Sequence, residues 1–360
     1  MSLAQPKRIL IIKLRHHGDV LLSTPVVDAL KTRFPDCEID MLVYAGTGQL
    51  IADNPQITQI FTIDRNWKKL GVFKQLACEK NLFSKLKARD YDWAFNLSDQ
   101  WRAAVIAKLC ARCSVGFDCI KRDGFWWRFC HDFINHELDP SHHIVENQLN
   151  ILAPLIQPED VADAKVRLWV AQDARESMRQ KLRDQGWSGK DYVLLHPGAR
   201  WHFKCWEDGK NSAIVQLLLN SGQNVVLTAS PDTVEQYMLQ EIIGRLNIPE
   251  GGKVWVLSGC LSLRELAAAI EGAKLFVGVD SAPMHIAAAL DKPQIALFGA
   301  SWVDKWRPYS EQAEVIYAGD YAELPHPDSI DTNDPTRLLK AIPLQDVWDR
   351  ISAKLEALEA

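Results

Sequence analysis

The chain has 360 residues, of which 47% are hydrophobic and 24% charged, a composition that excludes a disordered, collagen-like or coiled-coil protein. At about 150 residues per domain, this length predicts two domains. The formal net charge of −5 argues against nucleic-acid binding by the chain as a whole. Residues 61–133 differ, because they hold 14 Lys and Arg against 8 Asp and Glu, a net charge of +6. This local excess could recruit an anionic partner.

The sequence lacks the signals of a secreted or membrane-spanning protein. No stretch approaches the roughly 18–20 consecutive apolar residues of a membrane-spanning helix. The short N-terminal apolar run is followed by charged residues and not by a cleavage site, so we expect a cytoplasmic protein. The 8 cysteines are then expected to be buried free thiols. Cys110 and Cys113 have the C-x-x-C spacing of a zinc site, but no second pair at ligand spacing accompanies them.

Short apolar runs alternate with helical patterns along both halves of the chain. The runs predict strands over residues 8–13, 38–43, 59–63, 93–97, 192–196, 224–228, 254–257, 275–279 and 294–298. The periodic patterns predict helices over residues 24–34, 101–109, 211–220, 234–246, 263–271 and 282–290. Strands that alternate with helices are typical of parallel sheets covered on both faces.

These elements predict an α/β protein with two doubly wound, Rossmann-like domains, over residues 1–160 and 175–335. The join is expected between Pro154 and Ala174, where prolines and acidic residues interrupt the pattern. An amphipathic helix over residues 343–358 follows, and it could pack back on the N-terminal domain. Two such domains facing one cleft occur in many nucleotide-sugar transferases and in other two-domain enzymes.

The loop after the first predicted strand carries a glycine followed by a carboxylate, Gly18 and Asp19. Ligands of open α/β sheets bind beyond the carboxyl ends of the strands, so Asp19 could accept a proton from an attacking hydroxyl group. Alternatively, Asp19 caps the helix that follows. The G-x-G-x-x-G fingerprint of dinucleotide-binding proteins is absent.

Three junctions in the second half could bind an anion. Arg200 and Lys204 follow the strand over 192–196, where they could contact phosphate or form a solvated loop. Asp280 and Ser281 precede a helix whose free N–H groups would attract an anion. Gly299 follows the strand over 294–298 and could line a phosphate site or belong to a plain turn.

Basic and aromatic residues interleave in the first half, in a chain with 13 tryptophans. Such residues could stack on sugars and bind phosphates, or they could form an ordinary solvated face. The candidates for an acceptor-binding surface are His17, Lys68, Lys69, Trp101, Arg102, Lys121, Arg122 and Arg128.

The order of motifs along the chain carries a resemblance. RILIIK and GDVLLSTP stand near the start, HPGAR and KCW in the middle, and GVDSAPMHIAAAL and ALFGAS near the end. In this order they resemble the ADP-heptose:lipopolysaccharide heptosyltransferases of glycosyltransferase family 9. Within that family, LRHHGDVLLSTPV, FTIDRNWKK, NLSDQWRAAV and RWHFKCW look most like the members that add the third core heptose.

The resemblance implies a GT-B fold, in which two Rossmann-like domains face a central cleft. It implies an inverting transfer of L-glycero-D-manno-heptose from ADP-heptose to the phosphorylated inner core of lipopolysaccharide. The enzyme would need no cofactor or metal and would associate peripherally with the cytoplasmic face of the inner membrane. We expect the acceptor on the N-terminal domain, because of its basic stretch, and the donor on the C-terminal domain.

The resemblance also assigns residues. Asp19 matches the catalytic carboxylate of the family. The expected donor-binding residues are Lys204, Arg200, Asp280, Ser281, Ala282, His285, Glu235 and Gly299, with Asp232 as an alternative to Glu235 for the ribose contact. The chain departs from some relatives by having Ala199 and Arg200 where they carry threonines, which puts a hydroxyl contact to phosphate in doubt there.

Other functions remain open at this point. A GT-B glycosyltransferase with a different nucleotide-sugar donor would have a similar pattern. A non-catalytic protein that binds lipopolysaccharide would also keep the fold, although it would have no need of Asp19, Lys204 and Asp280 together. Nucleic-acid binding by the basic stretch is disfavoured by the net charge of −5.

Overall fold

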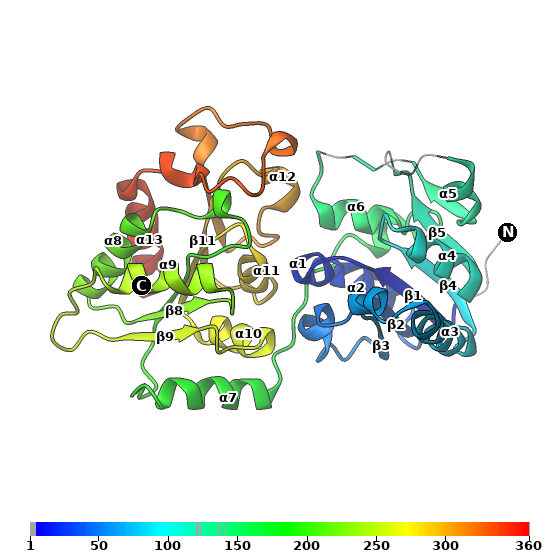
Figure 1. Ribbon diagram of the computed structural model, residues 1–360, viewed down its shortest axis with the longest axis horizontal. Coiled ribbons are helices and arrows are strands. Elements are labelled where there is room, and N and C mark those ends of the chain that lie inside the picture. The colour runs from blue at the N-terminus through cyan, green and yellow to red at the C-terminus, as the bar shows by residue number, and fades with distance from the viewer. Residues whose placement is uncertain (1–4, 120–121, 123, 137, 140, 360) are drawn as a thin grey trace. The chain divides into compact units, whose positions relative to one another are not determined.

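The computed structural model describes residues 5–119, 122, 124–136, 138–139 and 141–359, and it divides into two compact units, Met1–Trp169 and Val170–Ala360 (Figure 1). The division lies within the stretch 154–174 that the sequence indicates as the join. Each unit is built on one six-stranded parallel sheet. The α/β class and the two doubly wound sheets predicted from the sequence are confirmed.

The sheet of the first unit has the strand order β3-β2-β1-β4-β5-β6. Its strands are β1 (Arg8–Lys13), β2 (Glu38–Tyr44), β3 (Gln59–Ile63), β4 (Tyr91–Asn96), β5 (Ala111–Phe117) and β6 (Phe133–Asn135). Its helices are α1 (His17–Leu21), α2 (Thr24–Arg33), α3 (Val72–Ala88), α4 (Trp101–Cys110), α5 (Phe125–Phe129) and α6 (Ile144–Asn150). Helix α2 packs against α6, and α3 packs against α4. The central strand β1 is almost fully buried, as expected of a parallel sheet with helices on both faces.

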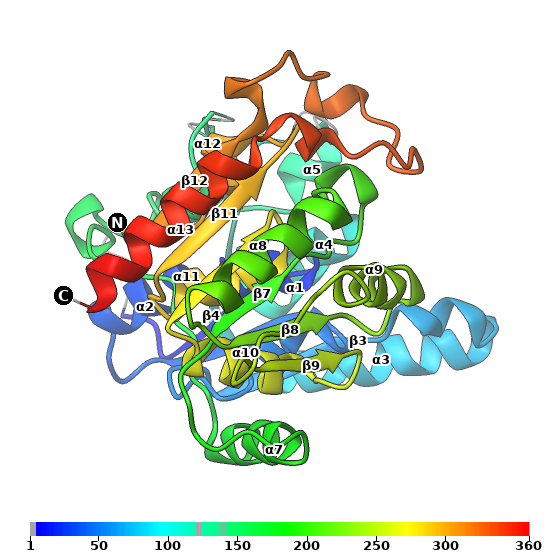
Figure 2. The same cartoon turned by 90° about the vertical axis from the view of Figure 1, so that its left-hand side faces the viewer.

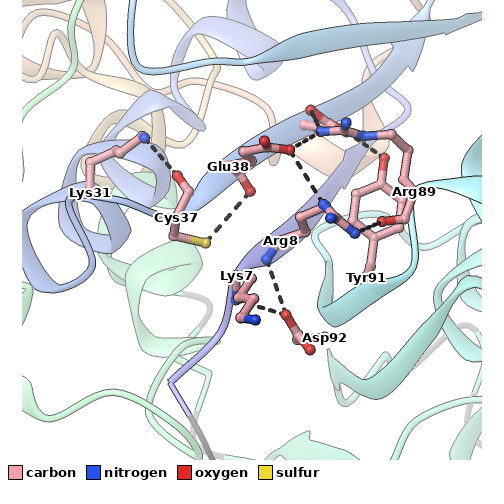
Figure 3. Close-up of polar contacts among 9 residues, drawn as sticks. Lys7, Arg8, Lys31, Cys37, Glu38, Arg89, Tyr91 and Asp92 are labelled. Carbon is pink, nitrogen blue, oxygen red and sulfur yellow. Dashed lines mark hydrogen bonds and ion pairs between the residues drawn. The ribbon is translucent and has the colours of Figure 1, made fainter.

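A buried polar network joins the amino ends of β1, β2 and β4 (Figure 3). The carboxylate of the fully buried Asp40 accepts hydrogen bonds from Arg89 Nε and from the hydroxyl of Tyr91, both at 2.7 Å. Arg89 also contacts Glu38 at 2.6 Å, and Arg8 donates to the carbonyl of Arg89 at 2.6 Å. Burial and the neighbouring Asp40 raise the pKa of Tyr91, so that the phenol stays protonated and donates. These contacts hold the amino ends of the three strands together, at the edge of the sheet opposite to the carboxyl ends.

The sheet of the second unit has the order β12-β11-β10-β7-β8-β9. Its strands are β7 (Val193–His196), β8 (Val225–Ala229), β9 (Val254–Ser258), β10 (Leu275–Val279), β11 (Gln294–Phe298) and β12 (Ala313–Tyr317). Its helices are α7 (Gln172–Arg183), α8 (Asp208–Asn220), α9 (Thr233–Ile243), α10 (Leu263–Gly272), α11 (Ala282–Ala289), α12 (Val303–Trp306) and α13 (Leu344–Glu359). In the described part of the chain, no helix has the length and apolarity needed to span a bilayer.

The C-terminal helix α13 is an element of the second unit, beside α8 (Figure 2). Val347, Ile351 and Leu355, spaced four residues apart on one face, belong to the apolar core of that unit. The amphipathic helix expected over 343–358 is therefore present, but its apolar face is used within the second unit.

A glycine in β5 allows a histidine to pack against the sheet of the first unit. The buried His131 contacts the backbone carbonyl of Trp127 through Nδ1 at 2.9 Å and the side chain of Asn96 through Nε2 at 3.1 Å. A Cβ atom on Gly116 would lie only 2.4 Å from the ring of His131. Burial lowers the pKa of His131, so the ring is neutral and joins β4, β5 and α5 without a buried charge.

This close approach predicts a stability defect in Gly116→Ala. The added methyl must displace His131 and disturb both of its hydrogen bonds, so we expect a loss of about 1–3 kcal/mol in the free energy of unfolding. Urea unfolding measures the change. The matched control is Gly124→Ala, since no atom lies within 4 Å of a Cβ at Gly124. Equal stability of the two variants would show that the ring and the sheet do not pack as described.

Candidate functional site

In both sheets the strand order reverses at the first strand of the unit, so that later strands are added on either side of it. In the first unit, β1 lies between β2 and β4, and in the second unit β7 lies between β8 and β10. The loops that leave two such neighbouring strands diverge to opposite faces of the sheet, so a crevice opens at the carboxyl ends of the strands. The junctions β1/β4 and β7/β10 are therefore the expected ligand sites of the two units.

In the second unit, Lys204 and Asp280 meet at this crevice. Lys204 ends the 3₁₀ helix His202–Lys204 that follows β7, and Asp280 follows β10 directly. The ammonium group of Lys204 donates to the carboxylate of Asp280 at 2.6 Å, and the two side chains are only 15% and 6% exposed. The ammonium group also lies 5.1 Å from the ring centre of Trp201. Since an ammonium group has three donors, Lys204 can bind a further anion without leaving Asp280.

The beginning of α11 adds a second attraction for an anion beside this pair. Ser281 is the N-cap residue, but its hydroxyl donates to the carbonyl of Val279 at 3.2 Å and does not cap the helix. At the start of the eight-residue helix, Pro283 has no N–H and the N–H of Met284 donates to the carbonyl of Ser281 at 3.2 Å, so Ala282 supplies the N–H that a ligand could meet. Together with the helix dipole, this N–H favours negative charge next to Asp280 and Lys204. His285 is buried one turn further on.

Glu235 is held at the carboxyl ends of β7 and β8. Its carboxylate accepts the backbone N–H of Ser230 at 2.9 Å and lies 3.8 Å from Nε2 of His196. A Cβ atom on Gly198 would lie 2.5 Å from the same carboxylate, so a glycine is needed there. Burial lowers the pKa of His196, which keeps its ring neutral beside Glu235. Asp232, the alternative candidate, accepts the N–H of Val234 and caps α9.

Two further donor candidates differ in their surroundings. Gly299 stands where a Cβ atom would lie 2.6 Å from the side chain of Leu339 and 3.5 Å from the carbonyl of Phe203. This position therefore has a packing reason to be glycine, whether or not it contacts a ligand. Arg200 is exposed, with its guanidinium 5.8 Å from the ring centre of Trp201.

In the first unit, Asp19 lies in the first turn of α1, just beyond β1. Its half-buried carboxylate has no hydrogen-bond or ion-pair partner among the residues that the structure describes. The cap position of α1 is taken by His16, so the helix-cap role considered from the sequence is not observed. Burial, with His16 and Arg65 nearby, lowers the pKa of His17, and its buried Nδ1 has no partner in the described part of the chain. The carboxylate of Asp19 is therefore not engaged by another described side chain.

A pocket of about 250 Å³ opens at the carboxyl ends of β1, β2 and β3. It is lined by Leu14, Arg15, His16, Tyr44, Asp64, Arg65, Lys68, Gln100 and Arg102. Arg15 is paired with Asp99 at 2.8 Å, and Arg102 is paired with Glu79. Arg65 lies over the ring of Tyr44, with its guanidinium carbon 4.1 Å from the ring centre. Arg65 and Lys68 make no ion pair with a described carboxylate, and with the one carboxylate of Asp64 in the same lining they leave the pocket a net positive charge.

The structure brings only some of the expected acceptor residues to this pocket. Lys68 and Arg102 line it, and His17 belongs to the adjoining α1. The other expected residues lie elsewhere. Lys69 is exposed at the end of the 3₁₀ helix Arg65–Lys69. Trp101 is exposed on α4, and Arg128 is exposed on α5. Arg122 donates to the carbonyl of Asp99 at 3.2 Å. Lys121 lies outside the described residues.

Among the pocket residues that the sequence analysis missed are Arg15, Tyr44 and Arg65. Each comes within two residues of the end of a strand, which is the signal that could have found them.

In the part of the chain that the structure describes, the cysteines do not group into a metal site. Over the described residues, no group of three or more His, Cys, Asp or Glu side chains is arranged to hold a metal ion. Cys110 and Cys113 are buried free thiols, and burial raises the pKa of each to about 11. A thiol with this pKa stays protonated at neutral pH.

A family model for glycosyltransferase family 9 (heptosyltransferase) matches residues 80–336. The chain is also similar to lipopolysaccharide heptosyltransferase 3 of Escherichia coli, at 38% identity over 93% of this chain and 95% of the relative. A second relative of that name, from strain K12, is 37% identical over 93% and 94% of the two chains.

The chain belongs to glycosyltransferase family 9. It is therefore a glycosyltransferase of the heptosyltransferase family, as the motif order indicates. A family 9 glycosyltransferase from Veillonella parvula has a similar fold, with a TM-score of 0.83 at 21% identity over 99% of each chain. The ADP-heptose heptosyltransferase II of E. coli has a TM-score of 0.76 at 22% identity over 98% of this chain and 100% of its own. These likenesses confirm the GT-B fold.

The buried pair of this family 9 glycosyltransferase predicts a large coupling between Lys204 and Asp280. Removing one partner leaves a buried charge without its counterion, so Lys204→Met should lower the free energy of unfolding by roughly 3 kcal/mol. The double variant Lys204→Met/Asp280→Leu should recover part of that loss. Denaturant unfolding of the single and double variants gives the coupling.

The matched control is the exposed pair of Arg112 with Asp90, whose side chains are 66% and 63% exposed. Arg112→Met should change the free energy of unfolding by less than about 1 kcal/mol. Additive effects of the Lys204 and Asp280 substitutions would mean that the two charges do not interact in the folded protein.

Proposed function

We propose that this chain transfers L-glycero-D-manno-heptose from ADP-heptose to the phosphorylated inner core of lipopolysaccharide, with inversion, as the third heptose of the core. The observation that carries the proposal is the joint presence of Lys204, Asp280 and the start of α11 at the switch point of the second sheet. This arrangement suits a diphosphate attached to a sugar. The similarity to lipopolysaccharide heptosyltransferase 3 supports the choice of donor and acceptor.

The second unit would bind the donor. Lys204 and the N–H of Ala282, which follows Ser281, can bind the phosphates. Asp280, held against Lys204, can also accept a hydrogen bond from a sugar hydroxyl through its second oxygen. Glu235 could accept hydrogen bonds from the ribose, because a carboxylate has more acceptor sites than Ser230 uses. Arg200 and His285 remain candidates for weaker contacts at the same edge.

The first unit would bind the acceptor. Arg65 and Lys68 supply the positive charge that a phosphorylated sugar needs, in a pocket next to the helix that carries Asp19. Arg102, although paired with Glu79, adds further donors to the same pocket. The exposed residues Trp101 and Arg128 would contact more distant parts of a large acceptor.

The transfer follows from these roles. The acceptor oxygen attacks the anomeric carbon of the heptose from the face opposite to ADP, forming the new C–O bond as the bond to the diphosphate breaks. The proton of the hydroxyl group passes to the carboxylate of Asp19 late in this step, because an ordinary carboxylate is too weak a base to ionise the hydroxyl beforehand. Lys204 and the start of α11 stabilise the charge that develops on the departing ADP. We propose that these groups suffice and that the reaction uses no cofactor or metal.

The acceptor also determines where the enzyme would work. Lipopolysaccharide core is attached to a lipid, and residues 61–133 carry a net charge of +6. We therefore propose peripheral association with the cytoplasmic face of the inner membrane, where anionic lipids attract basic segments.

Reciprocal variants of the two units test the proposed function. Asp19→Asn removes the base without changing the size of the side chain, so kcat for transfer should fall roughly 10²–10⁴-fold while the affinity for ADP stays unchanged. Lys204→Met should instead weaken ADP binding by about 1.5–3 kcal/mol. Calorimetry with ADP, and a transfer assay with ADP-heptose, separate the two effects. Turnover of Asp19→Asn at the wild-type rate, or tighter binding of UDP or GDP than of ADP, would refute the assignment.

The acceptor pocket predicts a dependence on phosphate. Arg65→Ala and Lys68→Ala should each raise KM for the phosphorylated acceptor by about tenfold or more, because each removes a charge-assisted contact. The control is Lys85→Ala, an exposed lysine near the end of α3. A dephosphorylated acceptor should show little difference between the variants and the wild type. An unchanged KM for the phosphorylated acceptor in both pocket variants would place the acceptor phosphate elsewhere.

A further inference from the structure

The loop before α3 and the first turns of this helix, residues 70–76 (the α3 turn), expose several large apolar side chains. Phe73 is 90% exposed, Val72 71%, Leu76 59% and Leu70 45%. The exposure has a structural origin, since α3 buries only Leu82 and Leu86, both in its second half. Contiguous exposed apolar side chains on a folded protein are typical of an interaction surface.

The charges around the α3 turn are all of one sign. Residues 65–78 include four basic residues and no acidic one. Lys68, Lys69 and Lys74 are exposed, and none of them is in an ion pair with any described residue. Long lysine side chains can extend their charge away from an apolar centre. The α3 turn thus combines an apolar centre with basic surroundings, as segments that lie in the interface of a membrane do.

The position of the α3 turn connects it with the candidate acceptor pocket. Helices that follow parallel strands begin at the carboxyl edge of the sheet, and Lys68, two residues before the turn, lines the pocket. Figure 2 shows α3 extending past the strands of its own sheet. Within the first unit, the turn is therefore at the edge where an acceptor would arrive.

We infer that the α3 turn docks this enzyme on the surface of a phospholipid bilayer with anionic headgroups. Phe73, Val72 and Leu76 enter the boundary between headgroups and acyl chains, and Lys69 and Lys74 contact the lipid phosphates. The choice of a bilayer as the partner rests on charge complementarity and on the proposed function, in which the acceptor is anchored in a membrane. The docking residues are separate from Asp19, Arg65 and Lys68.

Vesicle binding of the purified full-length chain tests the inference. The wild type should sediment with vesicles of phosphatidylethanolamine and phosphatidylglycerol, and less so as salt rises, because exposed charges are screened. The triple variant Val72→Ser/Phe73→Ser/Leu76→Ser should partition at least about tenfold more weakly, since three apolar side chains no longer enter the bilayer. The matched control is Val234→Ser/Tyr237→Ser, which removes exposed apolar side chains of α9 and should leave partitioning unchanged.

A second pair of variants tests how much the lysine charges contribute to vesicle binding. Lys69→Gln/Lys74→Gln should weaken binding to the phosphatidylglycerol vesicles and have little effect on vesicles of phosphatidylcholine alone. Lys85→Gln, further along α3, should behave as the wild type. Equal binding of all these variants would overturn the inference.

Two other outcomes would also overturn it. If binding is kept by the α3-turn variant but lost by Phe125→Ser/Trp126→Ser/Phe129→Ser, then the exposed aromatic rings of α5 are the contact. If the wild type forms a dimer by sedimentation velocity that the α3-turn variant lacks, then the turn joins two copies of the chain.

A transfer assay separates this inference from the proposed function. With a deacylated, water-soluble acceptor, the α3-turn variant should keep the wild-type kcat and KM. With intact acceptor in vesicles, its KM should rise by about tenfold, in proportion to the lost partitioning. Failure of the wild type to transfer heptose would refute the proposed function and leave the vesicle result standing. An unchanged KM in vesicles would instead refute docking by the α3 turn.

Discussion

The buried ion pair between Lys204 and Asp280 is the interaction on which the account of the second unit depends. A lysine that is only 15% exposed needs a counterion, because an unpaired buried charge is strongly destabilising. Asp280 supplies this counterion at the point where the sheet opens. In the proposed function, the pair holds the ammonium group of Lys204 at the start of α11 before the diphosphate binds, so that little reorganisation is needed.

The topology of the sheets explains why the charged residues gather where they do. In each unit the chain crosses over to one side of the central strand and later to the other side. The loops that leave the neighbouring strands therefore separate at the carboxyl ends. In the first unit this edge carries Asp19 and the basic pocket. The opposite edge of the same sheet is closed by the buried network of Asp40, Arg89 and Tyr91 (Figure 3). Stability and function thus occupy opposite ends of the same strands.

Much of the fold follows from local patterns. The strands over 275–279 and 294–298 are fully buried apolar runs, and their predicted bounds agree with β10 and β11. The prediction omits β5, because Arg112, Ser114 and Gly116 interrupt its apolar pattern. It also omits α3, which buries so few side chains that its periodicity is weak, and α7, which begins near the end of the expected linker.

The candidate site could be predicted only in part. The motif order indicates Lys204 and Asp280 separately, but their contact joins residues 76 positions apart and depends on the pairing of β7 with β10. For Asp19, the sequence left a helix cap and a catalytic base as alternatives, and only the backbone of α1 shows that the cap position belongs to His16. Arg65 lies in the stretch FTIDRNWKK but was not singled out, because its place over Tyr44 depends on the pairing of β2 with β3.

The central claim is a single displacement in which Asp19 takes the acceptor proton as ADP leaves. The configuration of the new glycosidic bond tests this claim most directly. The measurement is the one-bond carbon–hydrogen coupling at the anomeric centre of the product, compared with that of the donor. A single displacement predicts inversion of the anomeric configuration. Retention of the configuration would contradict the account, because a single displacement from the face opposite to ADP cannot retain it.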